Sequence, residues 1–232
     1  MIEIGTKPIL WHIMKCYAQH GLTDFIICLG YRGYMIKEYF ANYFLHQSDV
    51  TIDMKSNQVE YHDSRSEPWR VTLVETGETT KTGGRLQLAA PFLDDSTFCL
   101  TYGDGLANID LAAQVAFHRD QKRLATMTVV RPPARFGSSI IEGNRVTAFE
   151  EKPQAAEGLI NGGFFVLEPA VLDLIDGPET PWETTPLKKL AEMNQLSAWE
   201  HDGFWQPMDT LREKELLEEL WTSGEAPWKM WD

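Results

Sequence analysis

The sequence predicts an α/β protein with a doubly wound, mostly parallel sheet. Helix and strand signals alternate from residue 8 to residue 130, and the strand segments are short apolar runs that end near glycine or other turn residues. Alternation of this kind implies right-handed crossovers, which place ligands outside the carboxyl ends of the strands. Residues 131–232 favour a mixed α+β part whose hairpins decorate the main sheet. One main domain is expected for a chain of 232 residues.

The expected helices have apolar residues at helical spacing and defined ends. The first covers residues 8–20, and Gly21 is its stop signal. Its buried face is expected to consist of Ile9, Ile13, Met14 and Tyr17. The next helices are expected at 34–44, after the turn-rich residues 77–84 as far as about Ala90, at 108–121 with Asn108 or Asp110 as cap, and at 211–221.

The expected strands are short apolar segments between these helices. They cover residues 24–30, 69–76, 124–130 and 162–169, and a further strand in 96–105 runs into a sharp Gly-Asp loop. Residues 138–149 instead predict a hairpin that turns at Gly143 and Asn144. The Gly-Asp loop therefore lies at the carboxyl end of a strand, where ligands bind in this class of fold.

Composition excludes several classes of partner. The chain has 21 basic and 34 acidic residues and a formal net charge of −13, which argues against a nucleic-acid backbone or an anionic membrane as its main partner. Cys16, Cys28 and Cys99 lack metal-ligand spacing and are expected to be buried, reduced thiols. No apolar run reaches the ~18 residues of a membrane span, and no signal segment is recognisable, so the expected compartment is the cytoplasm.

Two aspartates on short turns are the main candidates for chemistry. Asp104 lies between Gly103 and Gly105, which permit a tight bend and the approach of a phosphate. Taken alone, Asp104 could cap a turn, and Asp209 could be the N-cap of the helix that follows it. Taken together, they are better explained as oxygen ligands of Mg²⁺, which accepts one or two carboxylates and completes its shell with water and substrate phosphate.

Three further segments carry weaker signals for binding an anionic sugar. "KTGGRL" places Arg85 at a helix start, where free N–H groups favour an anion or a base carbonyl, although a plain loop also explains it. Lys152 in "EEKP" could bind a sugar phosphate while Glu151 accepts sugar hydroxyls, but such runs are usually solvated faces. "NGGFF" could cradle a sugar ring or form a β-bulge with core Phe residues. The loop "RPPARFG", which ends at Gly137, could close over a ligand.

Longer segments resemble the glucose-1-phosphate cytidylyltransferases, a group within the sugar nucleotidyltransferase family. The resemblance spans nearly the whole chain. The segments that carry it most specifically are "NYFLHQSDVT" and "GFWQPMDTLR", and the others are "KPILWHIMK", "DFIICLGY", "EPWRVTLVETG", "TGGRL", "TYGDG", "EEKP", "INGGFFVLEP" and "APWKMW".

The resemblance implies a Rossmann-like nucleotidyltransferase fold and a specific reaction. In that reaction an oxygen of glucose 1-phosphate attacks the α-phosphorus of CTP, pyrophosphate leaves and CDP-glucose forms, with Mg²⁺ as cofactor. The product would feed deoxy-sugar synthesis for surface polysaccharides such as lipopolysaccharide O antigen. The resemblance further implies a nucleotide-binding core in residues 1–130, a sugar-binding part with the C-terminal helix in 131–232, and a trimeric or hexameric homo-oligomer.

The same resemblance assigns roles to residues by motif. Asp104 and Asp209 resemble the magnesium ligands, and Lys152 resembles the sugar-phosphate lysine. The expected nucleotide contacts are Thr80, Arg85 and Gly103, and the expected hexose contacts are Glu151, Asn161 and Gly162. These roles fit nucleotidyl transfer, because a metal with Lys and Arg neutralises phosphate charge without a protein nucleophile.

One departure from the family pattern affects the expected activity. Family members have a strand and a loop of the form GGxGTR before the position that Met1 matches. Without them we expect unpaired edges on the neighbouring strands and strongly reduced turnover, since loss of one preorganised donor can cost ~3 kcal/mol of barrier. Two alternatives stay open: transfer from another nucleotide donor, and a non-catalytic protein that binds sugar phosphate or serves assembly.

Overall fold

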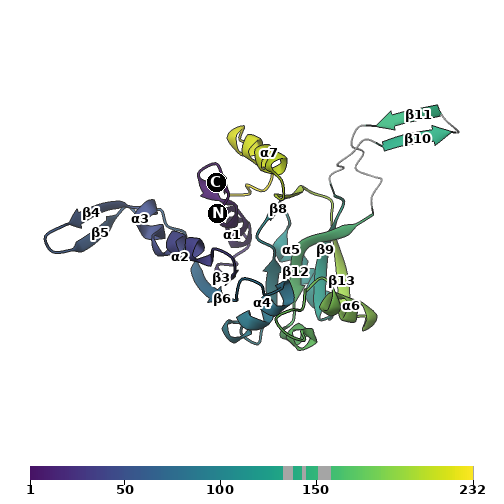
Figure 1. Ribbon diagram of the computed structural model, residues 1–232, viewed down its shortest axis with the longest axis horizontal. Coiled ribbons are helices and arrows are strands. Elements are labelled where there is room, and N and C mark those ends of the chain that lie inside the picture. The colour runs from purple at the N-terminus through teal and green to yellow at the C-terminus, as the bar shows by residue number, and fades with distance from the viewer. Residues whose placement is uncertain (133–137, 143–144, 151–157, 232) are drawn as a thin grey trace.

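The computed structural model describes residues 1–132, 138–142, 145–150 and 158–231. Figure 1 shows a body of packed helices and strands from which two hairpins project on opposite sides. One projection is formed by α3 (Tyr43–Gln47) with the hairpin β4–β5 (Asp49–Asp53 and Gln58–His62). The other is the predicted hairpin β10–β11 (Ser138–Glu142 and Arg145–Glu150), whose antiparallel pairing is confirmed. The hairpin β4–β5 was not predicted from the sequence.

The body contains two main sheets with helices packed on them, which confirms the α/β class. A two-stranded parallel sheet pairs β3 (Asp24–Leu29) with β6 (Arg70–Glu75). A four-stranded sheet has the order β13 (Leu196–His201), β9 (Ala125–Val130), β12 (Ile160–Leu167) and β7 (Phe98–Thr101). All four strands predicted from residues 24 to 130 are therefore present, with bounds that shift by a few residues.

The larger sheet is mixed, so the prediction of a mostly parallel sheet needs correction in this detail. Strand β12 runs antiparallel to both β7 and β9, and parallel pairing is confined to β3–β6 and β9–β13. β12 follows the hairpin β10–β11 rather than a crossover helix, and an antiparallel neighbour needs no such crossover. Within the described residues, β3 pairs only with β6 and β7 only with β12.

Helix α1 confirms the amphipathic pattern that was predicted for it. In α1 (Ile9–Ala18) all four residues of the predicted face are buried, and Gly21 after the helix has a φ of +78°. The predicted helix 34–44 is divided at Asn42 into α2 (Gly33–Ala41) and α3, because the Asn42 side chain donates to the Glu38 carbonyl and ends the first helix. No helix in the described part of the chain has the length and apolarity needed to cross a membrane.

The later helices begin where capping residues allow. In α5 (Leu111–Gln121) Asp110 is the cap, because its carboxylate accepts the Ala113 N–H at 2.9 Å. The remaining helical segments are α4 (Thr82–Ala89), the 3-10 turns Ala90–Phe92 and Pro169–Leu174, α6 (Thr185–Glu192) and α7 (Leu211–Thr222).

Two hydrophobic clusters hold these elements together. The first joins α1 to α7, to the small antiparallel pair β8 (Gly105–Ala107) and β14 (Trp205–Pro207), and to the C-terminal segment around Trp228. The second lies between the four-stranded sheet, α4 and α6, and is centred on Phe165 and Trp182. The N-terminal pair β1 (Glu3–Ile4) and β2 (Lys7–Pro8) packs on α7, where the Gly5 N–H donates to the Glu218 carboxylate.

The cysteines are unpaired thiols, as predicted. Burial raises the pKa of Cys16 to about 12 and that of Cys99 to about 11, so both stay protonated at neutral pH. Cys28 is half-buried and its pKa is also raised by burial. None of the three is therefore suited to nucleophilic chemistry.

Candidate active site

The antiparallel pair β8–β14 brings Asp104 and Asp209 to the same end of one ladder. Gly105 pairs with Pro207 in register, and the Met208 N–H donates to the Asp104 carbonyl at 2.7 Å. The two aspartates therefore follow directly from the end of this ladder, although 105 positions separate them in the sequence (209 minus 104). In keeping with this proximity, the negative charge of Asp209 contributes to raising the pKa of the Asp104 carboxyl group.

The helix-cap explanation of Asp209 is excluded by the geometry at α7. Thr210 is the N-cap, and its hydroxyl accepts the Glu213 N–H at 3.3 Å. The Glu213 carboxylate in turn accepts the backbone N–H groups of Asp209 and Thr210 at 2.8 and 2.9 Å, which completes a capping box. The Asp209 side chain is consequently not engaged in capping and is exposed beside Asp104.

The charge at this pair is poorly compensated by the protein. The pKa of Asp104 is raised, mainly by burial of its carboxyl group and further by the negative charge of Asp209. Within the described residues neither carboxylate forms an ion pair, and no group of three or more His, Cys, Asp or Glu side chains is arranged around a metal position. Two adjacent carboxylates with no cationic partner are a donor set that fits Mg²⁺, which needs few protein ligands.

The glycines beside Asp104 leave space at the site. At Gly103 and Gly105 an added Cβ would meet no atom within 4 Å, and neither residue has a positive φ. The chain itself therefore does not require glycine at either position. The space is consistent with the predicted approach of a ligand to the Asp104 carboxylate.

Asn161 and Gly162 lie on β12, next to the strand pair β8–β14. The pairing of β12 with β9 shifts register between Asn161 and Phe165, so the bulge expected as an alternative for "NGGFF" is present, and Phe164 and Phe165 are core residues. The Trp205 indole on β14 donates to the Gly162 carbonyl at 2.7 Å. This bond connects the predicted hexose-binding residues to the strand that leads to Asp209.

Tyr102 links the bulge to the Asp104 loop. Its ring covers Gly163, where φ is +79° and an added Cβ would lie 2.7 Å from the ring. The Asn161 amide donates to the Tyr102 hydroxyl at 3.4 Å and its carbonyl oxygen accepts the Gly163 N–H at 2.8 Å. Asn161 is therefore oriented by two contacts within the chain.

The glycine pair of "KTGGRL" packs against the chain rather than forming a free anion cradle. An added Cβ on Gly83 would lie 2.6 Å from the Thr180 carbonyl, and one on Gly84 would lie 2.5 Å from Pro178. The Gly84 N–H donates to the Thr180 carbonyl, so this N–H at the start of α4 is not available to a ligand. Of the N–H groups expected to be free at this helix start, that of Gly84 is therefore occupied, and the two glycines permit close packing of the loop before α6.

Arg85 extends from α4 to the carboxyl ends of β3 and β6. Its Nη1 donates to the Leu29 carbonyl at 3.2 Å and to the Thr76 hydroxyl at 2.6 Å, and its Nη2 donates to the Glu78 carbonyl at 3.2 Å. These bonds hold the guanidinium group at the edge of the sheet where this fold binds ligands. Thr80, also predicted to contact the nucleotide, lies in the same loop, with its hydroxyl beside Gly77.

Three predicted residues, Gly137, Glu151 and Lys152, lie outside the described residues. Three others near the site were missed in the sequence: Tyr102, Glu183 and Trp205. Tyr102 is part of "TYGDG" and Trp205 precedes Asp209 closely, so their proximity to the aspartates was a usable signal. Glu183 has no such signal, because only the folded chain brings it to Tyr102 and Thr82.

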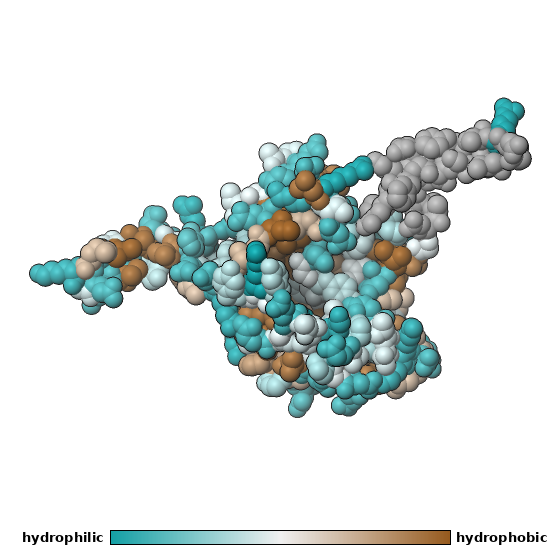
Figure 2. Space-filling view, viewed as in Figure 1, coloured by the Kyte–Doolittle hydropathy of each residue, from teal (hydrophilic) through white to brown (hydrophobic). Residues whose placement is uncertain are grey.

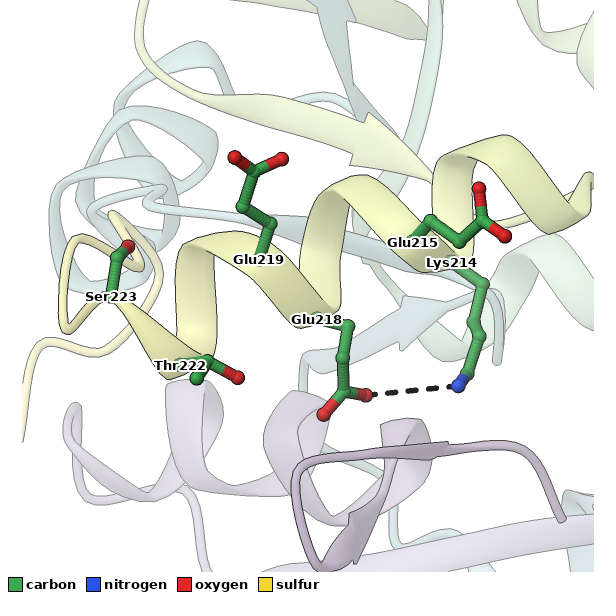
Figure 3. A pocket seen from close by; sticks show the side chains of 6 residues that line it. All are labelled: Lys214, Glu215, Glu218, Glu219, Thr222 and Ser223. Atoms are coloured by element: carbon green, nitrogen blue, oxygen red, sulfur yellow. Dashed lines mark ion pairs between the residues drawn. The ribbon is translucent and has the colours of Figure 1, made fainter.

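A separate hollow on the outer face of α7 contains none of the predicted residues. It is lined by Lys214, Glu215, Glu218, Glu219, Thr222 and Ser223. Figure 3 shows the pair between the Lys214 ammonium and the Glu218 carboxylate, which are 3.7 Å apart, and Glu219 pointing away from them. We assign no function to this hollow.

Comparison with known proteins identifies the family of this chain. The sequence profile of the family described as Nucleotidyl transferase matches residues 1–208. The chain belongs to the nucleotidyl transferase family. The glucose-1-phosphate cytidylyltransferase of Salmonella typhi is 57% identical over 233 residues, covering 100% of this chain and 91% of that protein. The probable glucose-1-phosphate cytidylyltransferase of Bacillus subtilis is 42% identical, covering 98% and 89%.

Solved structures confirm the fold of this nucleotidyl transferase. A putative glucose-1-phosphate thymidylyltransferase from Bacillus anthracis superposes with a TM-score of 0.65 at 16% identity, covering 94% of this chain and 84% of that one. At this identity the likeness is a likeness of fold. The Rossmann-like class predicted from the sequence is thereby confirmed.

Proposed function

We propose that this nucleotidyl transferase moves a cytidylyl group from CTP to glucose 1-phosphate, giving CDP-glucose and pyrophosphate. The 57% identity to the Salmonella typhi glucose-1-phosphate cytidylyltransferase across the whole chain supports the substrates. The single structural observation that carries the proposal is the convergence of Asp104 and Asp209 at the end of the β8–β14 ladder. The product then serves nucleotide-sugar metabolism for deoxy sugars and surface polysaccharides.

The reaction needs no covalent intermediate on the protein. An oxygen of the sugar 1-phosphate forms a bond to the α-phosphorus of CTP, and the bond from that phosphorus to the bridging oxygen of the β-phosphate breaks. Pyrophosphate takes the electron pair and leaves, so no redox partner is required. The protein has to align the two phosphates and offset the negative charge that develops on them.

The described residues divide this task between two sides of the site. Arg85 and Thr80 hold the nucleotide near the ends of β3 and β6, where Arg85 retains N–H groups besides those bonded to Leu29, Thr76 and Glu78. Asn161 and Gly162 contact the hexose beside Tyr102. The roles proposed for Gly137, Glu151 and Lys152 rest on the sequence alone.

Asp104 and Asp209 would hold Mg²⁺. When bound, the ion supplies charge neutralisation on the reacting phosphates. The open space at Gly103 and Gly105 admits the triphosphate to this position. The Trp205 indole, on the strand that leads to Asp209, connects the β8–β14 ladder to the sugar side through the Gly162 carbonyl.

The substrate assignment is tested by product analysis with the 232-residue chain. We expect phosphorus NMR to detect CDP-glucose after incubation with CTP, glucose 1-phosphate and Mg²⁺, and to detect no sugar nucleotide when glucose 6-phosphate replaces glucose 1-phosphate. Equal product from dTTP, UTP or GTP would favour the alternative of another donor. Calorimetric binding of glucose 1-phosphate with no product from any nucleotide would favour the non-catalytic alternative.

We also propose that the protein forms a homo-oligomer in the cytoplasm through the projecting arm, residues 43–62. This arm exposes large apolar side chains on a narrow hairpin, and Figure 2 shows apolar surface along it. The exposed fractions are 57% for Phe44, 50% for Ile52, 87% for Met54, 47% for Val59 and 48% for Tyr61. An isolated two-stranded hairpin is at best marginally stable, so a second copy packed on it would both bury this surface and stabilise the arm.

Replacing Ile52 with Lys should weaken this assembly. Ile52 pairs with Val59 across the hairpin, and a buried charge in an apolar contact is costly. Light scattering should show a mass nearer the 26.5 kDa of one chain for the variant than for the wild type. Met193→Lys is the matched control, because Met193 is equally exposed at 52% and lies outside the arm. A wild-type protein that is already monomeric, or an Ile52→Lys variant of unchanged mass, contradicts the proposal.

A further inference from the structure

Glu183 connects two elements of the site through both of its carboxylate oxygens. The Tyr102 hydroxyl donates to Oε1 at 2.7 Å, and the Thr82 hydroxyl donates to Oε2 at 2.7 Å. Glu183 follows Trp182, which is fully buried in the second hydrophobic cluster and fixes the position of this loop. The carboxylate is thus held by the core on one side and is exposed on the other, where the two hydroxyls meet it.

The two donors belong to the opposite sides of the site. Tyr102 lies two residues before Asp104, and its hydroxyl accepts a hydrogen bond from the Asn161 amide on the sugar side. Thr82 is the first residue of α4, one turn before Arg85 on the nucleotide side. Glu183 is therefore the group that joins the start of α4 to the end of β7.

The directions of these hydrogen bonds require an acceptor with two free oxygens. The Thr82 hydroxyl accepts the Trp182 N–H at 2.8 Å, which leaves its own hydrogen for Glu183. The Tyr102 hydroxyl accepts from Asn161 and likewise donates to Glu183. The pKa of Tyr102 is raised, chiefly by burial and further by Glu183, so the phenol remains a donor at neutral pH. A carboxylate satisfies both donors, whereas a carboxamide has only one oxygen to accept.

We propose that Glu183 is a positioning residue of the transferase site, which holds Arg85 and the Tyr102–Asn161 pair in register with the Asp104 loop. The expected kinetic effect rests on the proposed function, whereas the two hydrogen bonds that Glu183 accepts do not depend on that function. A carboxylate that accepts two hydroxyl hydrogens orients both groups without contacting substrate. Loss of one bond should loosen one side of the site, and loss of both should loosen both sides.

The test compares Glu183→Gln with Glu179→Gln. Glu179 lies in the same loop, is exposed and loses the same charge, but makes no side-chain hydrogen bond or ion pair in the described structure. We expect Glu183→Gln to lower kcat/KM for CDP-glucose formation by about tenfold, the value of one hydrogen bond to a charged group, and Glu179→Gln to change it less than about twofold. The unfolding temperatures of both variants should stay close to that of the wild type.

A second readout does not require activity. Hydrogen exchange of backbone amides should become faster in Glu183→Gln both at residues 82–86 and at residues 101–105, and should remain unchanged there in Glu179→Gln. If exchange changes only around residue 183, or equally in both variants, the positioning role is wrong whatever the kinetics show. If the wild type forms no CDP-glucose but exchange in Glu183→Gln becomes faster at both segments, the proposed function is wrong and the positioning role of Glu183 is supported.

The variant Tyr102→Phe separates positioning from a general charge effect. It removes only the hydroxyl that donates to Glu183 Oε1. The loss of kcat/KM in the double variant should therefore be smaller than two independent effects would give. Additive losses in the double variant would show that Glu183 does not act through Tyr102. That result, together with unchanged exchange at residues 101–105, would overturn the inference on the sugar side.

Discussion

Replacing Asp104 with Asn should lower the rate of CDP-glucose formation by at least about 100-fold, because an oxygen ligand of the proposed cation and its charge are lost together. The side chain keeps its size, so the β8–β14 ladder that holds it should remain intact. A radiometric assay with CTP and glucose 1-phosphate measures the effect. Asp95→Asn is the control, since Asp95 is an exposed aspartate in the loop before β7 and lies outside the site.

The same substitution should not destabilise the metal-free protein. The raised pKa of Asp104 means that the folded chain binds a proton here more readily than the unfolded chain. The free energy of unfolding therefore decreases as the pH rises from the ordinary aspartate pKa to the raised pKa of Asp104. Above the raised pKa both carboxylates are charged, and their repulsion destabilises the folded chain in full. Asp104→Asn removes this cost, so in EDTA at pH 7 its unfolding temperature should equal or exceed that of the wild type.

Mg²⁺ should change the unfolding temperatures of the wild type and of Asp104→Asn by different amounts. A ligand that binds only the folded state stabilises it, so Mg²⁺ should raise the unfolding temperature of the wild type and have much less effect on Asp104→Asn. Because the pKa of Asp104 is raised, the wild-type rate should begin to fall during acidification while the pH is still higher than the ordinary aspartate pKa of about 3.9. An Asp104→Asn variant that keeps both its activity and its thermal response to Mg²⁺ would show that the aspartate pair does not hold the ion.

The sequence predicted the body of the fold because its local signals agree with the tertiary packing. The apolar face of α1 and the short runs of β3, β6 and β9 are all found where the pattern placed them. The mixed pairing of β12 could not be predicted, because residues 160–167 are apolar enough for either orientation. The hairpin β4–β5 was missed because apolar residues in a sequence are expected to be buried, whereas those of this hairpin are exposed in the single chain.

The site shows the same division between local and non-local information. Asp104 and Asp209 were predicted as a pair because each lies on a short turn with a specific flanking sequence, and the β8–β14 ladder brings them together. The packing role of the glycines of "KTGGRL" was not predicted, since a sequence does not reveal that Pro178 and Thr180 pack on them. Glu183 was missed for the same reason. Its function depends on two partners about 80 and 100 positions away.

Replacing Trp228 with Ala should cost ~3–5 kcal/mol of stability, the usual range for removal of a fully buried aromatic side chain. Trp228 is 0% exposed. Its ring stacks on Phe204 and Trp221, with centroids 5.5 and 6.4 Å away, and so joins the segment after α7 to the core. Denaturant unfolding followed by circular dichroism measures the change.

Trp228 also determines the environment of a buried histidine. Its indole donates to His12 Nδ1 at 3.4 Å, which leaves Nε2 of His12 to donate to the Ile4 carbonyl at 3.0 Å. The pKa of His12 is lowered, mainly by burial, while its backbone hydrogen bonds oppose the shift. Since the unfolded chain binds the proton more readily, wild-type stability should be full above the ordinary histidine pKa of about 6.5 and should decrease as pH falls below it.

The substitution should therefore change the pH dependence of stability as well as its magnitude. Without the indole, water reaches His12, its pKa returns toward the ordinary value, and the slope of the free energy of unfolding between pH 7 and pH 5 should become smaller. Trp228→Phe keeps an aromatic ring in the core but lacks the N–H and part of the indole, so it should recover part of the stability. Trp199→Ala is the control for loss of an indole, because Trp199 is half-buried and contacts Phe117 away from His12.

Two results would contradict this account of the C-terminal segment. If Trp228→Ala costs no more than Trp199→Ala, residues 223–231 do not contribute to the first hydrophobic cluster as the stacked rings indicate. If stability falls but its pH slope between 7 and 5 is unchanged, His12 is not the group that responds.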